Sequence, residues 1–218
     1  CDGIKRMYQD REDIFFYVSV QNEDYPQPAL PSDDVVPGIL SGLYKYKAGP
    51  EGPKIKAHIF GSGSIILQAL RAQEILAEKY GVSADIWSAT SYSRLRREAI
   101  AAKRWNVLHP TEKPRRSYLE TILAPEKGPF IAVSDNMKIV ADQIAPWVPG
   151  GLTTLGTDGF GRSDTREKLR HHFEVDRHWV TLAALKALAD AGEIEREKVA
   201  AALVKYNLDP NKPNPLTV

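Results

Sequence analysis

The sequence predicts a three-layer α/β/α fold, and two features of its pattern lead to this fold class. From residue 40 to the end, short apolar segments typical of strands alternate with longer amphipathic segments typical of helices. Strands joined by crossover helices run parallel, and the helices cover both faces of the sheet. With 218 residues, the chain is long enough for one such domain and a short appended piece.

The first part of the chain lies outside this alternation. Residues 4–9 fit the last turns of a helix, whereas residues 14–20 are aromatic and β-branched without a helical period, so they predict a buried strand. The prolines between Tyr25 and Pro37 remove backbone donors and favour extended conformations. A lone helix and strand bury little surface, so we expect them to need a partner. The predicted units are residues 1–25, a helix and strand of a preceding domain; residues 26–39, a proline-rich linker; and residues 40–218, the main domain.

The main domain begins with a short edge strand, and its elements then alternate. The apolar residues of the first long helix, among them Ile66 and Leu70, keep to one side of it, and Gly81 ends it. The predicted elements are a strand over 42–48, a strand over 56–60, a helix over 65–80, a strand over 84–89, a helix over 95–104, a short helix over 118–123, a strand over 130–133, a helix over 137–148, a strand over 152–155, and helices near 165–173, 177–191 and 195–206.

The composition argues against several classes of protein. Lys and Arg number 29 against 28 Asp and Glu, with both signs interspersed, so neither nucleic acid nor a membrane surface is an expected partner. No apolar run approaches the roughly 20 residues that cross a bilayer. Cys1 is the only cysteine, which rules out an intrachain disulfide and suits the cytoplasm. The chain starts without an initiator Met or a signal peptide, as expected for the interior of a longer protein or a processed end.

Two familiar motifs are incomplete. Gly61-Ser62-Gly63 lies between a strand and a helix, but a dinucleotide fingerprint would need a third glycine where Ile66 stands. It would also need an acidic residue at the end of the next strand, whereas Asp85 stands at its start. Zinc ligands on a helix are three or four positions apart, but His171 and His172 are neighbours and point in different directions. We therefore expect a plain strand-to-helix turn and no zinc site, although one of these histidines can still face a cleft.

A glycine-rich loop follows the last predicted strand. Asp164 is placed to cap the next helix, with Glu167 as its capping-box partner, and Asp176 is placed to cap the helix after that. The loop lies at the carboxyl end of the sheet, where ligands bind in open α/β folds. These residues fit either a structural turn or a site in which Arg162 and Arg166 face an anionic substrate or a neighbouring domain.

The same loop carries a family resemblance. Residues 156–176 closely resemble a stretch near the C-terminus of the homodimeric, bacterial-type pyruvate dehydrogenase E1 family. Phe160-Gly161-Arg162-Ser163 is similar to the Phe-Gly-x-Ser turn of transketolase C-terminal domains, and Arg104-Trp105-Asn106-Val107-Leu108-His109-Pro110 is a second strong match to the E1 family. Further matching segments are residues 3–8, 17–25, 61–67 and 214–215.

This resemblance implies a transketolase C-terminal-type domain with a five-stranded, mostly parallel sheet and one antiparallel edge strand, preceded by the end of a pyrimidine-binding domain. It also implies a parent enzyme that decarboxylates pyruvate with thiamine diphosphate and Mg²⁺ and transfers the acetyl group to the lipoyl group of the E2 acyltransferase. The implied partners are a homodimer mate, the upstream domains and E2. The family's Gly-Asp-Gly cofactor motif is absent, so we expect no catalytic, cofactor-binding or metal-binding residue here and an inactive isolated chain.

By the same resemblance, the glycine-rich loop and the next helix are candidates for framing the substrate entrance or an interface. Trp87, Trp147 and Trp179 are candidates for packing in the core or at a dimer interface, with the core favoured. The candidate site residues are Asp158, Gly159, Phe160, Arg162, Ser163, Asp164 and His171.

Two alternatives stay open. One is another thiamine enzyme such as transketolase, which residues 169–176 and 22–25 disfavour because they match the pyruvate dehydrogenase family better. The other is a free-standing, non-catalytic α/β module that binds a nucleotide or a protein. A free-standing module would hardly keep a strand with no sheet to join, so the predicted strand over 14–20 argues against it.

Overall fold

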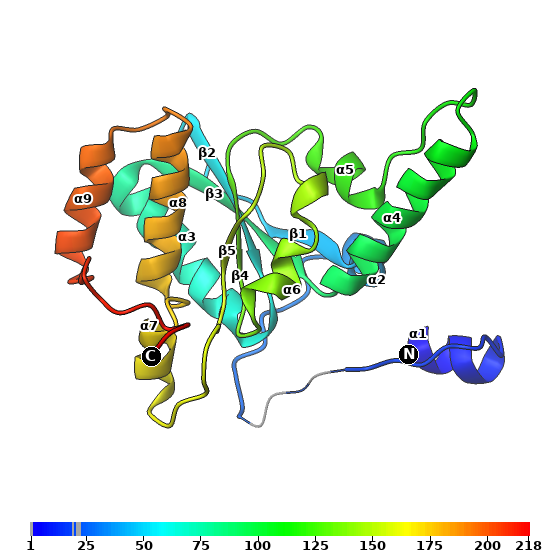
Figure 1. Cartoon of the computed structure of the whole chain (residues 1–218), viewed down its shortest axis with the longest axis horizontal. Coiled ribbons are helices and arrows are strands. Elements are labelled where there is room, and N and C mark those ends of the chain that lie inside the picture. Colours follow the sequence, from blue (N-terminus) through cyan, green and yellow to red (C-terminus); the bar gives the residue numbers. More distant parts are fainter. Residues whose placement is uncertain (1, 19, 21–22) are drawn as a thin grey trace.

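A five-stranded sheet sets the architecture of the main domain. The computed structural model describes residues 2–18, 20 and 23–218, and its strands lie in the order β1-β3-β2-β4-β5 (Figure 1). β1 runs antiparallel to β3 at one edge, and the other neighbouring pairs are parallel. The predicted fold class, including the antiparallel edge strand, is therefore confirmed. The strands are β1 Leu43–Lys47, β2 Ile55–Gly61, β3 Val82–Ala89, β4 Phe130–Val133 and β5 Thr153–Leu155.

The two edges of this sheet are short or irregular. At one edge, the register of β1 against β3 shifts between Lys45 and Lys47. At the other edge, β5 has only three residues and pairs with β4. The longest regular pairing is therefore in the middle of the sheet, where β2 pairs with β3.

Helices form a layer on each face of the sheet (Figure 1). α3 and α8 pack on one face, with α9 packed against α8, and α4, α5 and α6 pack on the other face. No helix in the described part of the chain is both long and apolar enough to cross a membrane. The helices are α1 Asp2–Ile4, α2 Val36–Ser41, α3 Ile66–Tyr80, α4 Tyr92–Leu108, α5 Tyr118–Leu123, α6 Lys138–Asp142, α7 Arg166–His172, α8 Arg177–Asp190 and α9 Arg196–Lys205.

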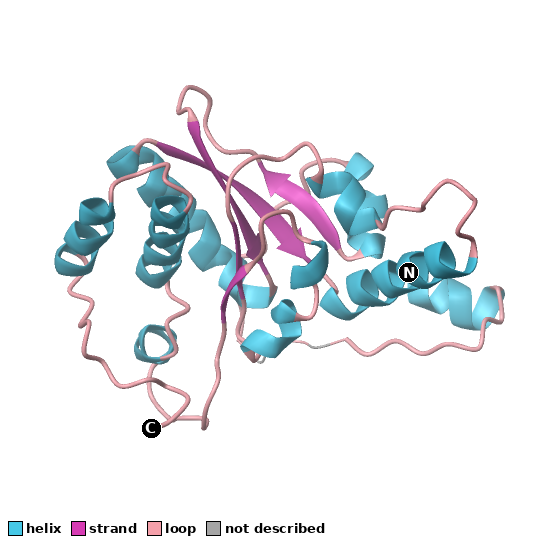
Figure 2. Ribbon diagram, turned by 45° about the horizontal axis from the view of Figure 1, so that its top comes forward, coloured by secondary structure: helices cyan, strands magenta, loops and turns pink. Residues whose placement is uncertain are grey.

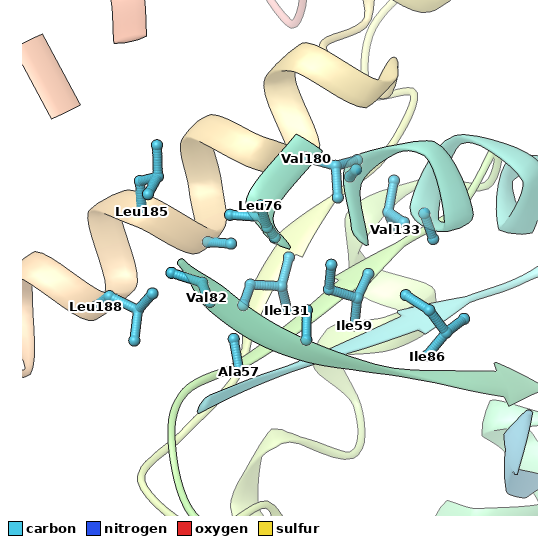
Figure 3. Packing of buried hydrophobic residues seen from close by; sticks show 14 of the residues in the cluster. Ala57, Ile59, Leu76, Val82, Ile86, Ile131, Val133, Val180, Leu185 and Leu188 are labelled. Atoms are coloured by element: carbon cyan, nitrogen blue, oxygen red, sulfur yellow. The ribbon is translucent and has the colours of Figure 1, made fainter. Parts of the chain in front are cut away.

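The core consists of two apolar clusters, one on each face of the sheet. Successive side chains of a strand point to opposite faces, so Ile131 and Val133 of β4 join the cluster under α3 and α8. Phe130 and Ala132 of the same strand join the cluster under α4, α5 and α6. Figure 3 shows the first cluster, in which strand side chains such as Ile59 and Ile131 face side chains of α3 and α8. This burial of apolar surface holds both helix layers on the sheet.

The three tryptophans in question occupy different surroundings. Trp87 is 4% exposed and belongs to the second cluster, so its predicted core role is confirmed. Trp147 is half-buried against the same cluster. Trp179 is half-buried at the start of α8, and its ring nitrogen is buried without a hydrogen-bond partner among the described residues. A role at a dimer interface stays a prediction for all three.

The N-terminal segment, residues 2–18 and 20, differs from the prediction. A helix is present, as α1 and a π-helical turn over Lys5–Gln9, but no described residue of the predicted strand 14–20 is in a strand. Phe15 and Tyr17 are 87% and 90% exposed, and Figure 2 draws this stretch as a loop outside the sheet. The strand prediction is wrong because a strand needs a neighbour with which to exchange backbone hydrogen bonds. Cys1, Ser19, Gln21 and Asn22 lie outside the described residues.

Prolines explain two further differences. The predicted helix over 137–148 is interrupted, because α6 is followed by a separate 3₁₀ turn that contains Pro146, which has no N–H to donate. The predicted linker over 26–39 ends in helical structure, with a 3₁₀ turn leading into α2. Pro37 lies in the first turn of α2, where backbone N–H groups have no partner within the helix, so a proline there costs no helical hydrogen bond.

Candidate functional site

A cavity of about 260 Å³ lies at the carboxyl end of the parallel strands. β2 has β3 on one side and β4 on the other, so the direction in which the chain adds strands switches between β2 and β4. Ser64 follows β2, Asp135 follows β4 and Thr157 follows β5, and all three line the cavity. Ligands of open α/β sheets bind at such a switch point. This switch-point cavity is therefore the first candidate for a functional site.

The glycine-rich loop after β5 forms one wall of the switch-point cavity. Thr157 donates from its backbone N–H to the Asn136 carbonyl (2.9 Å) and from Oγ1 to the Asp135 carbonyl (2.7 Å). Asp158 accepts a hydrogen bond from the backbone N–H of Lys138 at 2.9 Å. The start of the loop is thus fixed to the segment that follows β4.

Gly159 fixes the loop on its other side. Its φ is 101°, in the region that favours glycine, and an added Cβ would lie 2.2 Å from the carbonyl oxygen of Pro215. The C-terminal tail therefore packs directly on the loop backbone, and no larger residue fits at this position without displacing one of the two segments.

Guanidinium groups dominate the charge of the cavity. Arg162 comes from the loop, and Arg166 and Arg170 lie four residues apart on α7, so they share one face of that helix. Asp135 is the one carboxylate among the described lining residues. An apolar wall completes the lining: Ile65, Leu169, Phe173 and Val175. The cavity combines apolar surface with an excess of positive charge, so it suits an anionic group.

Two residues just before the linker are docked on the same helix. Glu23 forms an ion pair with Nε of Arg166. The Tyr25 ring centroid lies 5.8 Å from Cζ of Arg166 and 5.5 Å from Cζ of Arg170, and Arg170 also donates to the Tyr25 hydroxyl at 3.1 Å. Sequence reasoning missed this contact, because 145 positions separate Tyr25 from Arg170 and no spacing rule links them.

The predicted site residues separate into three groups. Gly159 and Arg162 line the switch-point cavity, and Asp158 supports its wall. Phe160, which is 83% exposed, and the exposed Ser163 and Asp164 do not belong to its lining. His171 lies on a different side of α7, at the second cavity described below.

The predicted cap of α7 is one residue out of place. Thr165, in an extended conformation, is the N-cap, and its Oγ1 accepts a hydrogen bond from the backbone N–H of Lys168. Asp164 instead accepts from the backbone N–H of Thr165 at 2.7 Å. The prediction of a capping box between Asp164 and Glu167 is therefore wrong, because the helix begins one residue later than expected.

A second cavity, of about 860 Å³, lies between α7, the start of α8 and the end of α9. His171 lines it, with Nδ1 3.0 Å from an Asp176 carboxylate oxygen. The other carboxylate oxygen of Asp176 caps α8, as predicted, by accepting from the backbone N–H of His178 at 2.8 Å. Burial lowers the pKa of His178, and burial together with two nearby cations lowers the pKa of His172.

Among the described residues, one group of potential metal ligands also comes together, beside Trp87 and Phe130 of the second cluster. Oxygen and nitrogen atoms of His58, Asp85 and Glu126 lie within 4.8 Å of one another. The Lys45 ammonium lies 2.7 Å from a carboxylate oxygen of both Asp85 and Glu126. Burial alone would lower the pKa of Lys45, but its hydrogen bonds to the two carboxylates outweigh burial and raise it. A lysine therefore supplies the cation of this group.

His58 completes this polar network as a neutral side chain. Its Nδ1 accepts from the Trp87 ring N–H at 3.3 Å, which leaves the hydrogen on Nε2, 3.0 Å from the Lys127 carbonyl. Burial lowers the pKa of His58, in agreement with this neutral tautomer. Burial alone would raise the pKa of Asp85, but hydrogen bonds from the Gly49 N–H and from Lys45 hold it below its ordinary value.

Comparison with known proteins identifies the relatives of this chain. A sequence model of the family described as "Transketolase-like TK C-terminal domain" matches residues 42–176. Over 218 residues the chain is 50% identical to a pyruvate dehydrogenase E1 component of Cupriavidus necator, and over 216 residues it is 48% identical to that of Pseudomonas aeruginosa. These matches cover 100% and 99% of this chain but 24% of each relative, so the chain spans about a quarter of their length.

Solved structures agree on the fold. The chain is similar to a transketolase variant from Pichia stipitis, with a TM-score of 0.52 and 19% identity, over 78% of this chain and 21% of that one. At this level of identity the likeness concerns the fold alone, and it matches the transketolase C-terminal type that the sequence predicted.

Proposed function

Because the chain belongs to the family of transketolase-like TK C-terminal domains, we propose that it is the corresponding region of a pyruvate dehydrogenase E1 enzyme. The observation that carries this proposal is 50% identity to an E1 component across all 218 residues, including those before and after the family domain. The longer enzyme would decarboxylate pyruvate with thiamine diphosphate and Mg²⁺ in the cytoplasm and transfer the acetyl group to the lipoyl group of E2. A transketolase function has less support, since this chain is only 19% identical in sequence to the transketolase variant of similar fold.

The side chains of this region do not fit the cofactor. Among the described lining residues of the switch-point cavity, the charged groups are three arginines and one carboxylate, whereas Mg²⁺ is held by carboxylates together with the phosphates. The group around Asp85 and Glu126 already contains the Lys45 ammonium. We therefore assign the cofactor to the upstream domains of the longer enzyme, and we expect the 218-residue chain to be inactive alone.

The role of this region would then be to complete the assembly. The glycine-rich loop and α7 would frame the substrate entrance or an interface with the upstream domains, the homodimer mate or E2. The docking of Glu23 and Tyr25 on α7 supports this role. These two residues end the segment that leads from the preceding unit, and they contact the helix that lines the cavity.

A chimera tests the proposal. The corresponding quarter of the Cupriavidus necator E1 component would be replaced by this chain, and acetyl transfer from pyruvate would be measured with thiamine diphosphate, Mg²⁺ and the E2 partner of that enzyme. We expect an active chimera. The 218-residue chain alone, assayed for pyruvate decarboxylation under the same conditions, should show no turnover.

Two outcomes would contradict the proposal. One is a chimera that assembles as a dimer, with the circular dichroism of the parent enzyme, but transfers no acetyl group. The other is pyruvate turnover by the isolated chain, which would require a cofactor site within these residues. A matched chimera carrying a transketolase C-terminal domain is the control. It tests whether any domain of this fold would support acetyl transfer.

A further inference from the structure

We propose that the switch-point cavity binds a small organic anion, with an apolar body on its inner wall and a single carboxylate or phosphate group on Arg162. This inference goes beyond the proposed function, since it concerns recognition of a ligand and not the chemistry of the longer enzyme.

The shape of the cavity supports a small ligand with two unlike ends. Ile65 and Val175 are 2% and 1% exposed and form an apolar inner wall, which Leu169 and Phe173 extend. A volume of about 260 Å³ equals about nine water molecules at the density of the liquid. A ring or branched chain of similar size would fill it and displace water from apolar surface.

Arg162 is the group best placed to bind the anionic end. Within the part of the chain that the structure describes, its guanidinium has no hydrogen-bond or ion-pair partner. Arg170, by contrast, is engaged with Tyr25, and Arg166 is paired with Glu23. A guanidinium that lines a concave, partly apolar cavity binds a carboxylate or phosphate through charge-assisted, often bidentate, hydrogen bonds.

The charge balance of the lining favours an anionic ligand over a neutral or cationic one. Among the described lining residues, Arg166 is balanced by Glu23, which leaves the Arg162 and Arg170 guanidinium groups against the Asp135 carboxylate. A cation would meet repulsion from the arginines, and a neutral ligand would gain no attraction from the Arg162 guanidinium. A ligand with one anionic group is attracted by the arginines and supplies an acceptor for the Arg162 guanidinium.

Binding to the full 218-residue chain tests this proposal without any assay of turnover. The probes are phenyl phosphate and benzoate, which carry the two candidate anionic groups on one apolar ring. Benzyl alcohol is the neutral analogue, and inorganic phosphate is the analogue without an apolar body. Affinities would be measured by calorimetry, and contact would be checked by saturation-transfer NMR.

We expect at least one of the two aromatic anions to bind with a Kd of about 5 mM or tighter, as the size of such ligands allows. Whichever binds more tightly identifies the anionic group. Inorganic phosphate and benzyl alcohol should bind about tenfold more weakly or not at all, and added salt should weaken the binding of the anion.

Arg162→Gln is the decisive variant, because Arg162 is exposed and its loss removes no hydrogen bond or ion pair among the described residues. It should weaken the anion by about tenfold, the loss expected for a charge-assisted hydrogen bond. Arg196→Gln, on the exposed start of α9, is the matched control and should bind like the parent chain. Equal affinity of the Arg162→Gln and parent chains, or no detectable binding of either aromatic anion, would overturn the proposal.

Discussion

The N-terminal segment and the main domain contain the same kinds of apolar residue, yet they bury them very differently. Ile131 in β4 is fully buried between neighbouring strands and helices, whereas Phe15 and Tyr17 are 87% and 90% exposed. Both stretches are rich in β-branched or aromatic residues. The comparison teaches that an apolar run favours a strand only where other strands offer hydrogen bonds and a helix covers the face.

The largest expected effect is a direct test of this contrast. Ile131→Ala should lower the free energy of unfolding by about 2–5 kcal/mol, because it leaves a cavity in the first cluster. Phe15→Ala should change it by less than about 0.5 kcal/mol, because an exposed side chain gives up no packing. Urea denaturation of both variants measures the difference. Similar losses for the two would mean that the N-terminal segment is packed in solution.

A second test asks whether the main domain also depends on its polar network. Lys45→Met should cost about 1–3 kcal/mol, since the Asp85 and Glu126 carboxylates would face each other without a cation, although partial exposure of Lys45 moderates the loss. Lys47→Met, on the exposed end of the same strand, is the control. Unfolding by urea at neutral pH measures both. Equal stability of the two variants would show that the network contributes nothing.

A third test concerns the packing of the glycine-rich loop on the C-terminal tail. Gly159→Ala should cost about 1–3 kcal/mol, because φ is 101° and the new Cβ would meet the Pro215 carbonyl. Gly161→Ala, where no atom lies within 4 Å of the added Cβ, should be close to neutral. Denaturation gives the cost, and carboxypeptidase digestion should release the tail faster only from the Gly159 variant. A tail equally protected in both would contradict the contact.

A fourth test locates the boundary between the two regions. Tyr25→Ala should lower stability by less than about 1 kcal/mol, since its cation–π contacts lie at a half-exposed site. Loss of the docking on α7 should nevertheless expose residues 26–32 to limited proteolysis. Tyr8→Ala, at a residue that is 79% exposed, should leave the cleavage rate unchanged. Unaltered cleavage of the Tyr25 variant would mean that other contacts hold the linker.

The smallest expected effect is a dependence of stability on pH that comes from the main domain. The pKa of His58 lies below its ordinary value in the folded state, so the unfolded chain binds a proton that the folded chain does not. Stability should therefore fall as pH decreases from 8 to below 6.5. In His58→Gln, the free energy of unfolding should depend less steeply on pH. The difference in slope should correspond to the uptake of less than one proton on unfolding. The pKa values of His172 and His178 are lowered too, so part of the slope should remain.

Most of the main domain could be predicted from local pattern, and the exceptions share a cause. The alternation around Ile131 and the edge strand before β2 follow from periodicity and turn residues alone. The strand expected over 14–20 did not form, because its existence depends on a neighbour that periodicity cannot reveal. The helix predicted over 137–148 took no account of Pro146, and Pro37 was assigned to an extended linker although it lies in the first turn of α2.

The candidate site was predictable only in part, for a similar reason. Gly159 and Arg162 could be placed because they follow a strand and so lie at the carboxyl end of the sheet. Ser64 and Asp135 reach the same cavity from other strands, so their roles required the strand order. The contact between Tyr25 and Arg170 could be found only from the three-dimensional path of the chain.

The two imperfect edges of the sheet bear on how copies of this chain meet. A long, flat edge strand invites another chain to extend the sheet, and this is a common route to aggregation. β1 resists such extension through its irregular register and its two lysines, and β5 offers a rim of only three residues. Edge-to-edge growth into fibrils is therefore disfavoured at both rims, and ordered self-association is left to side chains on the helices and loops.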